Sequence, residues 1–171
     1  MNYINKGKRD ILIFPKFNNI NKIQNIRRKY DELFNVLMPH ITLAFPFNNN
    51  ISNEQLKQKL KSIVADIEPF KIKCKGIALR KDDRTNTYYI FLNIVEGKEI
   101  IRKIHTRIYE EILKDVDIKK YNYEPHITLG TINNPNEEIE LDEEFETMVE
   151  SITVEQIGEN EESIIKFEVN L

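Results

Sequence analysis

Apolar residues recur at two different spacings along the chain, and the spacing changes from segment to segment. Intervals of three and four residues, typical of amphipathic helices, appear three times. Ser52 and Gln55 precede the second of these stripes in a capping-box pattern, and Pro69 follows it. The spacing predicts helices over residues 21–35, from 52 to before 69, and over 98–114, and the Glu-rich stretch 137–150 is predicted as a fourth helix.

Between these segments, apolar residues alternate with others or form short runs, as they do in β-strands. Pro15 closes the first such run, and Pro39 stops the preceding helix and admits the second. The polar residues 80–84 are predicted to form a turn between two others. The predicted strands cover residues 10–14, 40–45, 70–79, 87–95, 126–132, 151–157 and 163–169.

The order of these elements indicates an internal duplication, because each half contains strand, helix, strand, helix, strand, strand. Strands outnumber those of a simple βαβ array, which favours antiparallel or mixed pairing. We therefore predict an α+β fold spanning residues 1–171 as a single bilobal domain, in which two antiparallel or mixed β-sheets flank a cleft and helices pack outside. Lobe 1 is expected at approximately 9–86 and lobe 2 at approximately 87–171, and strands can be exchanged between the lobes.

Composition narrows the class of protein. Of the 171 residues, 40% are hydrophobic and 31% are charged, as in soluble globular proteins. The net charge of −3 and the pI of about 5.7 argue against a protein that coats long nucleic acid. Apolar runs fall short of the roughly 18 residues of a membrane span, and Met1 to Lys8 lacks a signal-peptide pattern. Cys74 is the single cysteine. We expect a cytoplasmic monomer without membrane attachment.

One pentapeptide, Pro-His-Ile-Thr-Leu, occurs twice, at 39–43 and at 125–129. Side chains alternate between the two faces of a strand, so His40 and Thr42 share one face while Ile41 turns toward the core. His126 and Thr128 repeat this arrangement. The two copies therefore predict two strands that present the same imidazole and hydroxyl groups.

Two imidazoles with pKa values near neutrality can act as general base and general acid on one phosphate. In hydrolysis of a 2′,3′-cyclic phosphate, the base activates water and the acid protonates the departing ribose oxygen. Threonine hydroxyls lie about 6.5–7 Å further along each strand, where they can donate to nonbridging phosphate oxygens. Such a site needs no metal and no cofactor, and the sequence does not decide which histidine is the base.

The doubled arrangement of His40-Ile41-Thr42-Leu43 and His126-Ile127-Thr128-Leu129 resembles the 2H phosphoesterase superfamily, specifically its 2′-5′ RNA ligase-like branch. The resemblance implies a bilobal α+β fold in which both histidines are catalytic and both threonines bind phosphate. Its members act on RNA 2′,3′-cyclic phosphates, on 2′-5′ linkages or on small cyclic nucleotide phosphates. In the ligase direction a 5′-hydroxyl would replace water.

The chain departs from many RNA-directed members of this branch, which carry a basic residue after the second motif. Here Gly130 and Thr131 follow Leu129, and by alternation Gly130 could open room for a ligand. Another positive charge would have to contact the phosphate. The candidates in the sequence are Arg80 and Arg84 in the polar turn, Lys119, Lys120 and Arg9.

Several other residues have a more ordinary interpretation. His105 lies on the predicted helix 98–114 and is expected to be a helix-flank residue, and Phe45 is expected in the core. Cys74 fits a buried small apolar side chain. Tyr121 and Tyr123 precede the second motif, so either could cap the core or stack on a nucleobase. Of the two, Tyr123 is the candidate that we retain for substrate binding, beside Arg80 and Arg84.

We therefore expect a metal-independent phosphoesterase that acts on a 2′,3′-cyclic phosphate or a 2′-5′ phosphodiester. Its expected partner is a small nucleotide or an RNA terminus that carries a phosphate ester, and not a long nucleic acid. Two alternatives stay open at this point. One is a noncatalytic protein that binds nucleotides or RNA ends at the same residues, and the other is a hydrolase of a non-nucleic phosphodiester.

Overall fold

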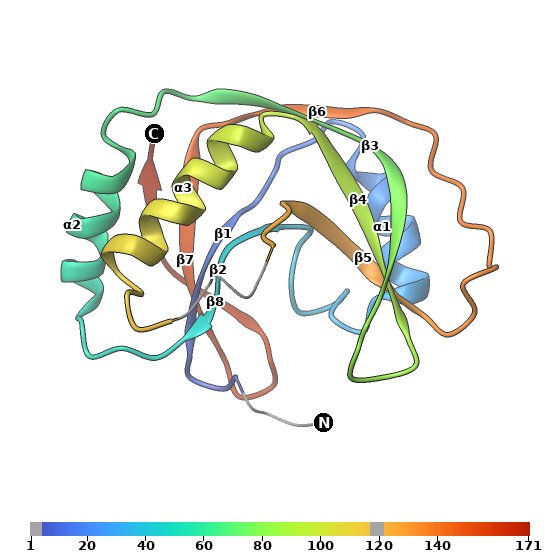
Figure 1. Ribbon diagram of the computed structural model, residues 1–171, viewed down its shortest axis with the longest axis horizontal. Helices are drawn as coiled ribbons and strands as arrows, with labels where there is room; N and C mark the ends of the chain where they lie inside the picture. Colours follow the sequence, from blue (N-terminus) through green and yellow to red (C-terminus); the bar gives the residue numbers. More distant parts are fainter. Residues whose placement is uncertain (1–4, 117–121) are drawn as a thin grey trace.

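The computed structural model describes residues 5–116 and 122–171, which form three helices and one antiparallel sheet of eight strands (Figure 1). The predicted α+β class is confirmed. In chain order the elements are β1 (Arg9–Ile13), α1 (Ile20–Tyr30), β2 (Ile41–Phe47), α2 (Asn53–Val64), β3 (Phe70–Lys81), β4 (Tyr88–Glu96), α3 (Lys98–Glu111), β5 (His126–Ile132), β6 (Phe145–Val149), β7 (Ser151–Ile157) and β8 (Ser163–Asn170).

The strands form one sheet in the order β6-β3-β4-β5-β2-β1-β7-β8, whereas the sequence predicts two separate sheets. The two halves of the sheet meet where β2 pairs with β5, through the single residue pair Ile41 and Ile127. These two isoleucines belong to the two copies of the repeated pentapeptide. The repeat therefore forms the junction at the centre of the sheet.

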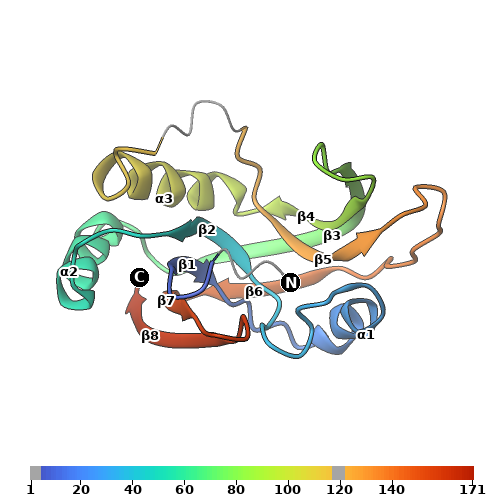
Figure 2. The same cartoon turned by 90° about the horizontal axis from the view of Figure 1, so that it is seen from below.

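Strands from the beginning and the end of the chain share one half of the sheet. Strand β1 pairs with β2 and with β7, and β7 pairs with β8. The other half consists of β3, β4, β5 and β6 from the middle of the chain. Figure 1 shows α2 and α3 beside the first half and α1 beside the second, and in Figure 2 α3 and α1 lie on opposite sides of the sheet.

Buried apolar side chains under the three helices form a continuous core that includes Ile23, Leu60, Ile104 and Leu129. Helix α2 begins with the predicted capping box, because Ser52 accepts from the Gln55 amide and the Gln55 side chain accepts from the Ser52 amide. Within the described residues, every helix is too short or too polar to cross a lipid bilayer.

The predicted Glu-rich helix at 137–150 is wrong, because residues 145–149 form the edge strand β6. Its Phe145 and Val149 are buried while the acidic side chains face a row of lysines on β3. Lys71 pairs with Glu146 at 3.1 Å, and Lys75 pairs with Glu144 at 2.9 Å. Favourable cross-strand charge pairs thus select a strand where local composition favours a helix. The first helix also ends earlier than predicted, at Tyr30.

Candidate functional site

The two histidines of the repeat are held in the same way by the backbone that precedes them. His40 Nδ1 lies 2.9 Å from the Met38 carbonyl oxygen, and His126 Nδ1 lies 2.7 Å from the Glu124 carbonyl oxygen. Because a carbonyl only accepts, Nδ1 carries the proton in each ring. In the neutral form, Nε2 is then the basic nitrogen. Both half-buried imidazoles are therefore in the tautomer that a general base requires.

Both histidines have a pKa below the ordinary value. Burial is the main cause for His40, the hydrogen bond to Met38 opposes it, and the nearby charge of Arg27 lowers the pKa further. A smaller contribution comes from the charge of His126, so the two imidazoles interact electrostatically. Burial is also the main cause for His126, and the charge of Arg80 adds to it.

Both strands carry an irregularity directly after the threonine. Consecutive residues of β1, Leu12 and Ile11, pair with Thr42 and Ala44, which skips one residue of β2. On β5, Thr128 and Gly130 likewise pair with consecutive residues of β4. Each histidine strand thus contains a β-bulge at the same motif position. Such bulges bend a strand and redirect its side chains.

The bulges explain two predictions that are wrong. Phe45 does not follow Ile41 into the core, and 55% of its surface is exposed. Gly130 does not open room for a ligand, because a Cβ at this position would lie 2.2 Å from the Tyr30 carbonyl oxygen at the end of α1. With φ at +132°, this position favours glycine. Gly130 therefore allows α1 to approach β5 closely.

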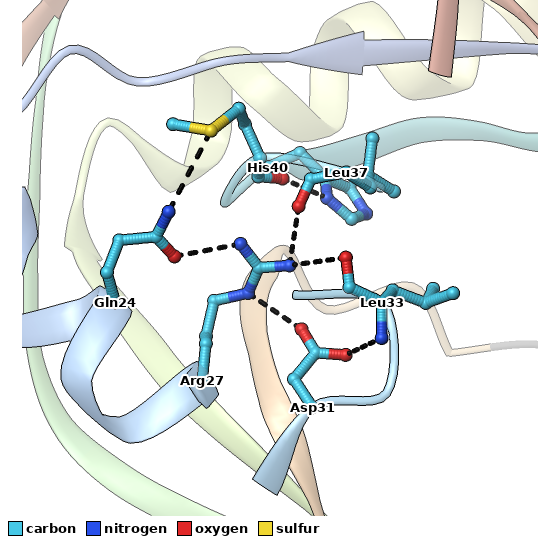
Figure 3. Close-up of polar contacts among 7 residues, drawn as sticks. Gln24, Arg27, Asp31, Leu33, Leu37 and His40 are labelled. Atoms are coloured by element: carbon cyan, nitrogen blue, oxygen red, sulfur yellow. Dashed lines mark hydrogen bonds and ion pairs between the residues drawn. The ribbon is translucent and has the colours of Figure 1, made fainter. Parts of the chain in front are cut away.

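A buried arginine fixes the segment that leads into His40 (Figure 3). Arg27 is 1% exposed, and its Nε donates to Asp31 Oδ2 at 2.7 Å. One terminal nitrogen donates to Gln24 Oε1 at 3.0 Å, and the other donates to the Leu37 carbonyl oxygen at 2.6 Å. Together these bonds tie α1 to residues 31–39, the segment between α1 and His40.

His126 is supported by an aromatic ring and by surface charges. The Phe91 ring of β4 stacks on its imidazole, with centroids 3.6 Å apart and planes at 22°. Glu124, whose carbonyl oxygen accepts from His126, pairs with Lys98 at 2.5 Å and with Arg102. Burial alone would raise the pKa of Glu124, but these two cations hold it below its ordinary value.

Three aromatic side chains bind the backbone of β2 where this strand leaves β5. Tyr123 donates to the Thr42 carbonyl oxygen at 2.7 Å, and His105 Nδ1 donates to the Leu43 carbonyl oxygen at 2.7 Å. The Phe45 amide donates to the Tyr109 hydroxyl at 3.2 Å. We call Tyr123, His105 and Tyr109 the β2 tie. Tyr123 precedes His126 by three residues, so the tie joins the first motif to the segment that leads into the second.

The tie corrects the prediction for His105, which is 5% exposed and stacks on Tyr123 with ring centroids 3.6 Å apart. One face of the Tyr123 ring is thereby covered, and burial raises the pKa of its hydroxyl. Cys74 is fully buried, as predicted, and burial raises the pKa of its thiol to about 12.

The positively charged candidates for contacting the phosphate have different surroundings in the structure. Arg80 is exposed on β3 and its charge reaches His126. Arg84 is bound to Asp82 at 3.3 Å in the β3–β4 turn. Arg9 donates to Asn53 Oδ1 at 2.9 Å and to the Ile51 carbonyl oxygen at 2.8 Å, beside a hollow of about 330 Å³ at the start of α2. Lys119, Lys120 and Tyr121 lie outside the described residues.

Sequence reasoning missed Arg27, Tyr89 and Phe91. A signal existed for each. Arg27 stands four residues after the buried Ile23, at the spacing of a core position. Tyr89 and Phe91 alternate with the buried residues of β4 and therefore share the opposite face of the strand.

The fold is shared with several solved structures. The crystal structure of TT0787 from Thermus thermophilus matches with a TM-score of 0.64 at 15% identity, over 96% of this chain and 97% of that one. The crystal structure of LigT from E. coli in complex with 3′-AMP matches with a TM-score of 0.62 at 15% identity, over the same shares.

Sequence comparison assigns the family. Residues 15–160 match the 2′-5′ RNA ligase superfamily, and the chain belongs to this family. It is also similar to a protein named "Putative phosphoesterase" from Geobacillus sp. (strain WCH70), with 30% identity over 127 residues that cover 72% of this chain and 68% of that protein. A protein of the same name from Geobacillus kaustophilus (strain HTA426) is 27% identical over 130 residues, with the same coverage.

Proposed function

We propose that this protein is a metal-independent phosphoesterase that acts on a 2′,3′-cyclic phosphate or a 2′-5′ phosphodiester of a nucleotide or an RNA end. The observation that carries the proposal is the matched pair of imidazoles, each with Nδ1 bonded to the carbonyl two residues before it. The names of the relatives support a phosphoesterase, and the 3′-AMP bound in the LigT structure supports a nucleotide as the ligand.

In the proposed reaction, a water molecule attacks phosphorus and gives its proton to the neutral Nε2 of one histidine. The other histidine is protonated and donates its Nε2 proton to the departing ribose oxygen. One P–O bond forms and one breaks, and the two rings exchange protonation states. The Thr42 and Thr128 hydroxyls donate to the nonbridging oxygens, on which negative charge increases in the transition state.

The lowered pKa values fit a site that is completed by its substrate. Without ligand, both rings are mostly neutral at pH 7, so neither is prepared to act as an acid. A bound phosphate carries negative charge, which raises the pKa of the nearer imidazole and favours its protonation. Turnover should therefore show a bell-shaped dependence on pH, whereas a protein that only binds would give no product at any pH.

The test is hydrolysis of a short RNA that ends in a 2′,3′-cyclic phosphate, in the presence of EDTA. His40→Ala and His126→Ala should each reduce kcat by about 10²- to 10⁴-fold, the usual contribution of one acid–base group. Thr42→Val and Thr128→Val should cost less. The exposed Thr106 of α3 offers a matched control, Thr106→Val. A kcat that stays at the wild-type level in either histidine variant would refute the mechanism.

A further inference from the structure

The two sides of the histidine site differ in how far the protein itself covers them. On the His40 side, Leu12 and Thr153 share a face with Thr42 through direct cross-strand pairing, and they are only 1% and 2% exposed. Residues 31–39 are bonded to β8 on this side, because the Ser163 amide donates to the Val36 carbonyl oxygen at 3.1 Å. The chain leaves little room here for the rest of a substrate.

On the His126 side the corresponding face is open within the described residues. Thr128 is paired with Phe91 of β4, and Phe91 is paired with Ala78 of β3. All three side chains are partly exposed. Tyr89 and its partner Arg80 extend the same face toward the β3–β4 turn. A ligand bound at the histidines therefore has space to continue over β4 and β3.

Two aromatic rings and one positive charge lie on this face, from the partly exposed Tyr89 and Phe91 and the exposed Arg80. The rings of Tyr89 and Phe91 are stacked, with centroids 5.7 Å apart and planes at 17°, and Phe91 in turn stacks on His126. The Tyr89 hydroxyl donates to Asp82 Oδ2 at 3.2 Å, which fixes the ring. Preordered aromatic rings beside a positive charge are the surface on which nucleobases stack and nucleic-acid backbones bind.

We propose that Tyr89, Phe91 and Arg80 form a nucleotide subsite, in which a nucleobase of the substrate lies against the aromatic pair and Arg80 contacts a phosphate. The substrate is then a base-bearing phosphodiester whose nucleoside extends from His126 over β4 and β3. This inference rests on the proposed function and refines it. Arg80 supplies the positive charge that Gly130 and Thr131 do not supply after the second motif.

Turnover of two substrates separates this subsite from the reacting centre. Adenosine 2′,3′-cyclic phosphate carries a base, whereas glycerol 1,2-cyclic phosphate carries the same reacting group without one. Tyr89→Leu should lower kcat/KM for the nucleotide about ten-fold and leave turnover of the glycerol compound unchanged. Tyr89→Phe keeps the ring but loses the bond to Asp82, so its loss on the nucleotide should be smaller than that of Tyr89→Leu. Phe167→Leu on β8, where the Phe167 ring lies against Lys57, is the matched control.

Binding provides a readout that does not depend on catalysis. AMP should bind the wild type more tightly than inorganic phosphate, and Tyr89→Leu should remove most of that difference while its affinity for inorganic phosphate is kept. Arg80→Met should weaken the binding of both. Equal losses of Tyr89→Leu on both cyclic substrates, or an unchanged preference for AMP, would overturn the subsite. If the folded wild type hydrolyses neither substrate, the proposed reaction fails, and the AMP comparison alone decides the subsite.

Discussion

The two copies of the pentapeptide share their local geometry but not their surroundings. Each histidine donates through Nδ1 to the carbonyl two residues earlier, and each strand has a bulge after its threonine. His40 depends on the buried Arg27, whereas His126 depends on the Phe91 ring and on ion pairs at the surface. Duplication therefore repeats the reacting groups, while different contacts position each of them.

The largest expected difference is in the loss of stability when the supporting arginine on each side, Arg27 or Arg102, is replaced. Arg27→Met removes a buried cation, leaves the Leu37 carbonyl oxygen without this donor and leaves the Asp31 carboxylate, with a side chain only 12% exposed, without its cation. Breaking a buried pair in this way should reduce the free energy of unfolding by about 3 kcal/mol or more. Arg102→Met on the His126 side removes a pair whose members are 35% and 41% exposed, and should cost at most about 1 kcal/mol.

Urea unfolding of the two variants measures this difference directly. Arg27→Met should also lower kcat, because residues 31–39 carry His40 into the site. Arg27→Lys retains the charge but not the forked donors, so its stability and its kcat should lie between those of the wild type and Arg27→Met. If Arg27→Met and Arg102→Met were equally stable, the buried network would not be the main support of His40.

The covered face on the His40 side predicts a dependence of stability on pH. Asp10 and Glu155 are paired across β1 and β7 and are 6% and 1% exposed. Burial, together with the neighbouring Glu155, raises the pKa of Asp10 from 3.8 to about 8, and burial also raises that of Glu155. At a pH between the unfolded-state pKa of Asp10, 3.8, and its folded-state pKa, about 8, Asp10 is protonated in the folded protein and ionised in the unfolded protein. Stability should therefore fall as pH rises from about 4 to about 8.

For one proton the slope is at most about 1.4 kcal/mol per pH unit. Asp10→Asn keeps the shape without an ionisable group, so its unfolding free energy should depend less on pH than that of the wild type. The difference between the two proteins at each pH, from urea unfolding at about pH 5 to 8, cancels the contribution of the histidines. Asp142→Asn, at an exposed position, is the control. A difference that does not change with pH would show that Asp10 is ionised in the folded state.

The elements that the sequence predicts well are those fixed by local pattern. Strands 126–132 and 151–157 match β5 and β7 at both ends, and the capping box at Ser52 marks the start of α2. Features that depend on distant partners were not predictable. Residues 145–149 of the Glu-rich segment form β6, where Glu146 pairs with Lys71 of β3, and Gly130 allows the close approach of Tyr30. The two His-x-Thr motifs are evident in the sequence. The residues that support them are distant, because Arg27 lies 13 residues before His40 and Phe91 lies 35 residues before His126.

A smaller loss of stability and of kcat is expected when the β2 tie is weakened. Tyr123→Phe removes the donor to the Thr42 carbonyl oxygen but keeps the ring stacked on His105. The loss should be about 1 kcal/mol of unfolding free energy, with a fall in kcat that exceeds any change in KM, because the Thr42 backbone loses its bond to the segment that leads into His126. Tyr109→Phe removes the bond to the Phe45 amide, three residues further along β2, and should affect kcat less. Equal effects of both variants on kcat would argue against a positioning role for Tyr123.

The smallest expected effect is a shift in the pKa of each histidine when its aromatic neighbour is replaced. The Phe91 ring is stacked on His126 with centroids 3.6 Å apart, whereas Phe14 meets His40 edge-on with centroids 6.3 Å apart. Burial is the first cause of the lowered pKa of His126, so Phe91→Leu should admit water and raise this pKa toward its ordinary value. The pKa of His40 should change less in Phe14→Leu, because its ring is not covered by Phe14. NMR titration of the imidazole protons resolves each histidine separately, with His105 as the internal reference. An unchanged pKa of His126 in Phe91→Leu would mean that the strands and not the aromatic ring exclude water from this side of the site.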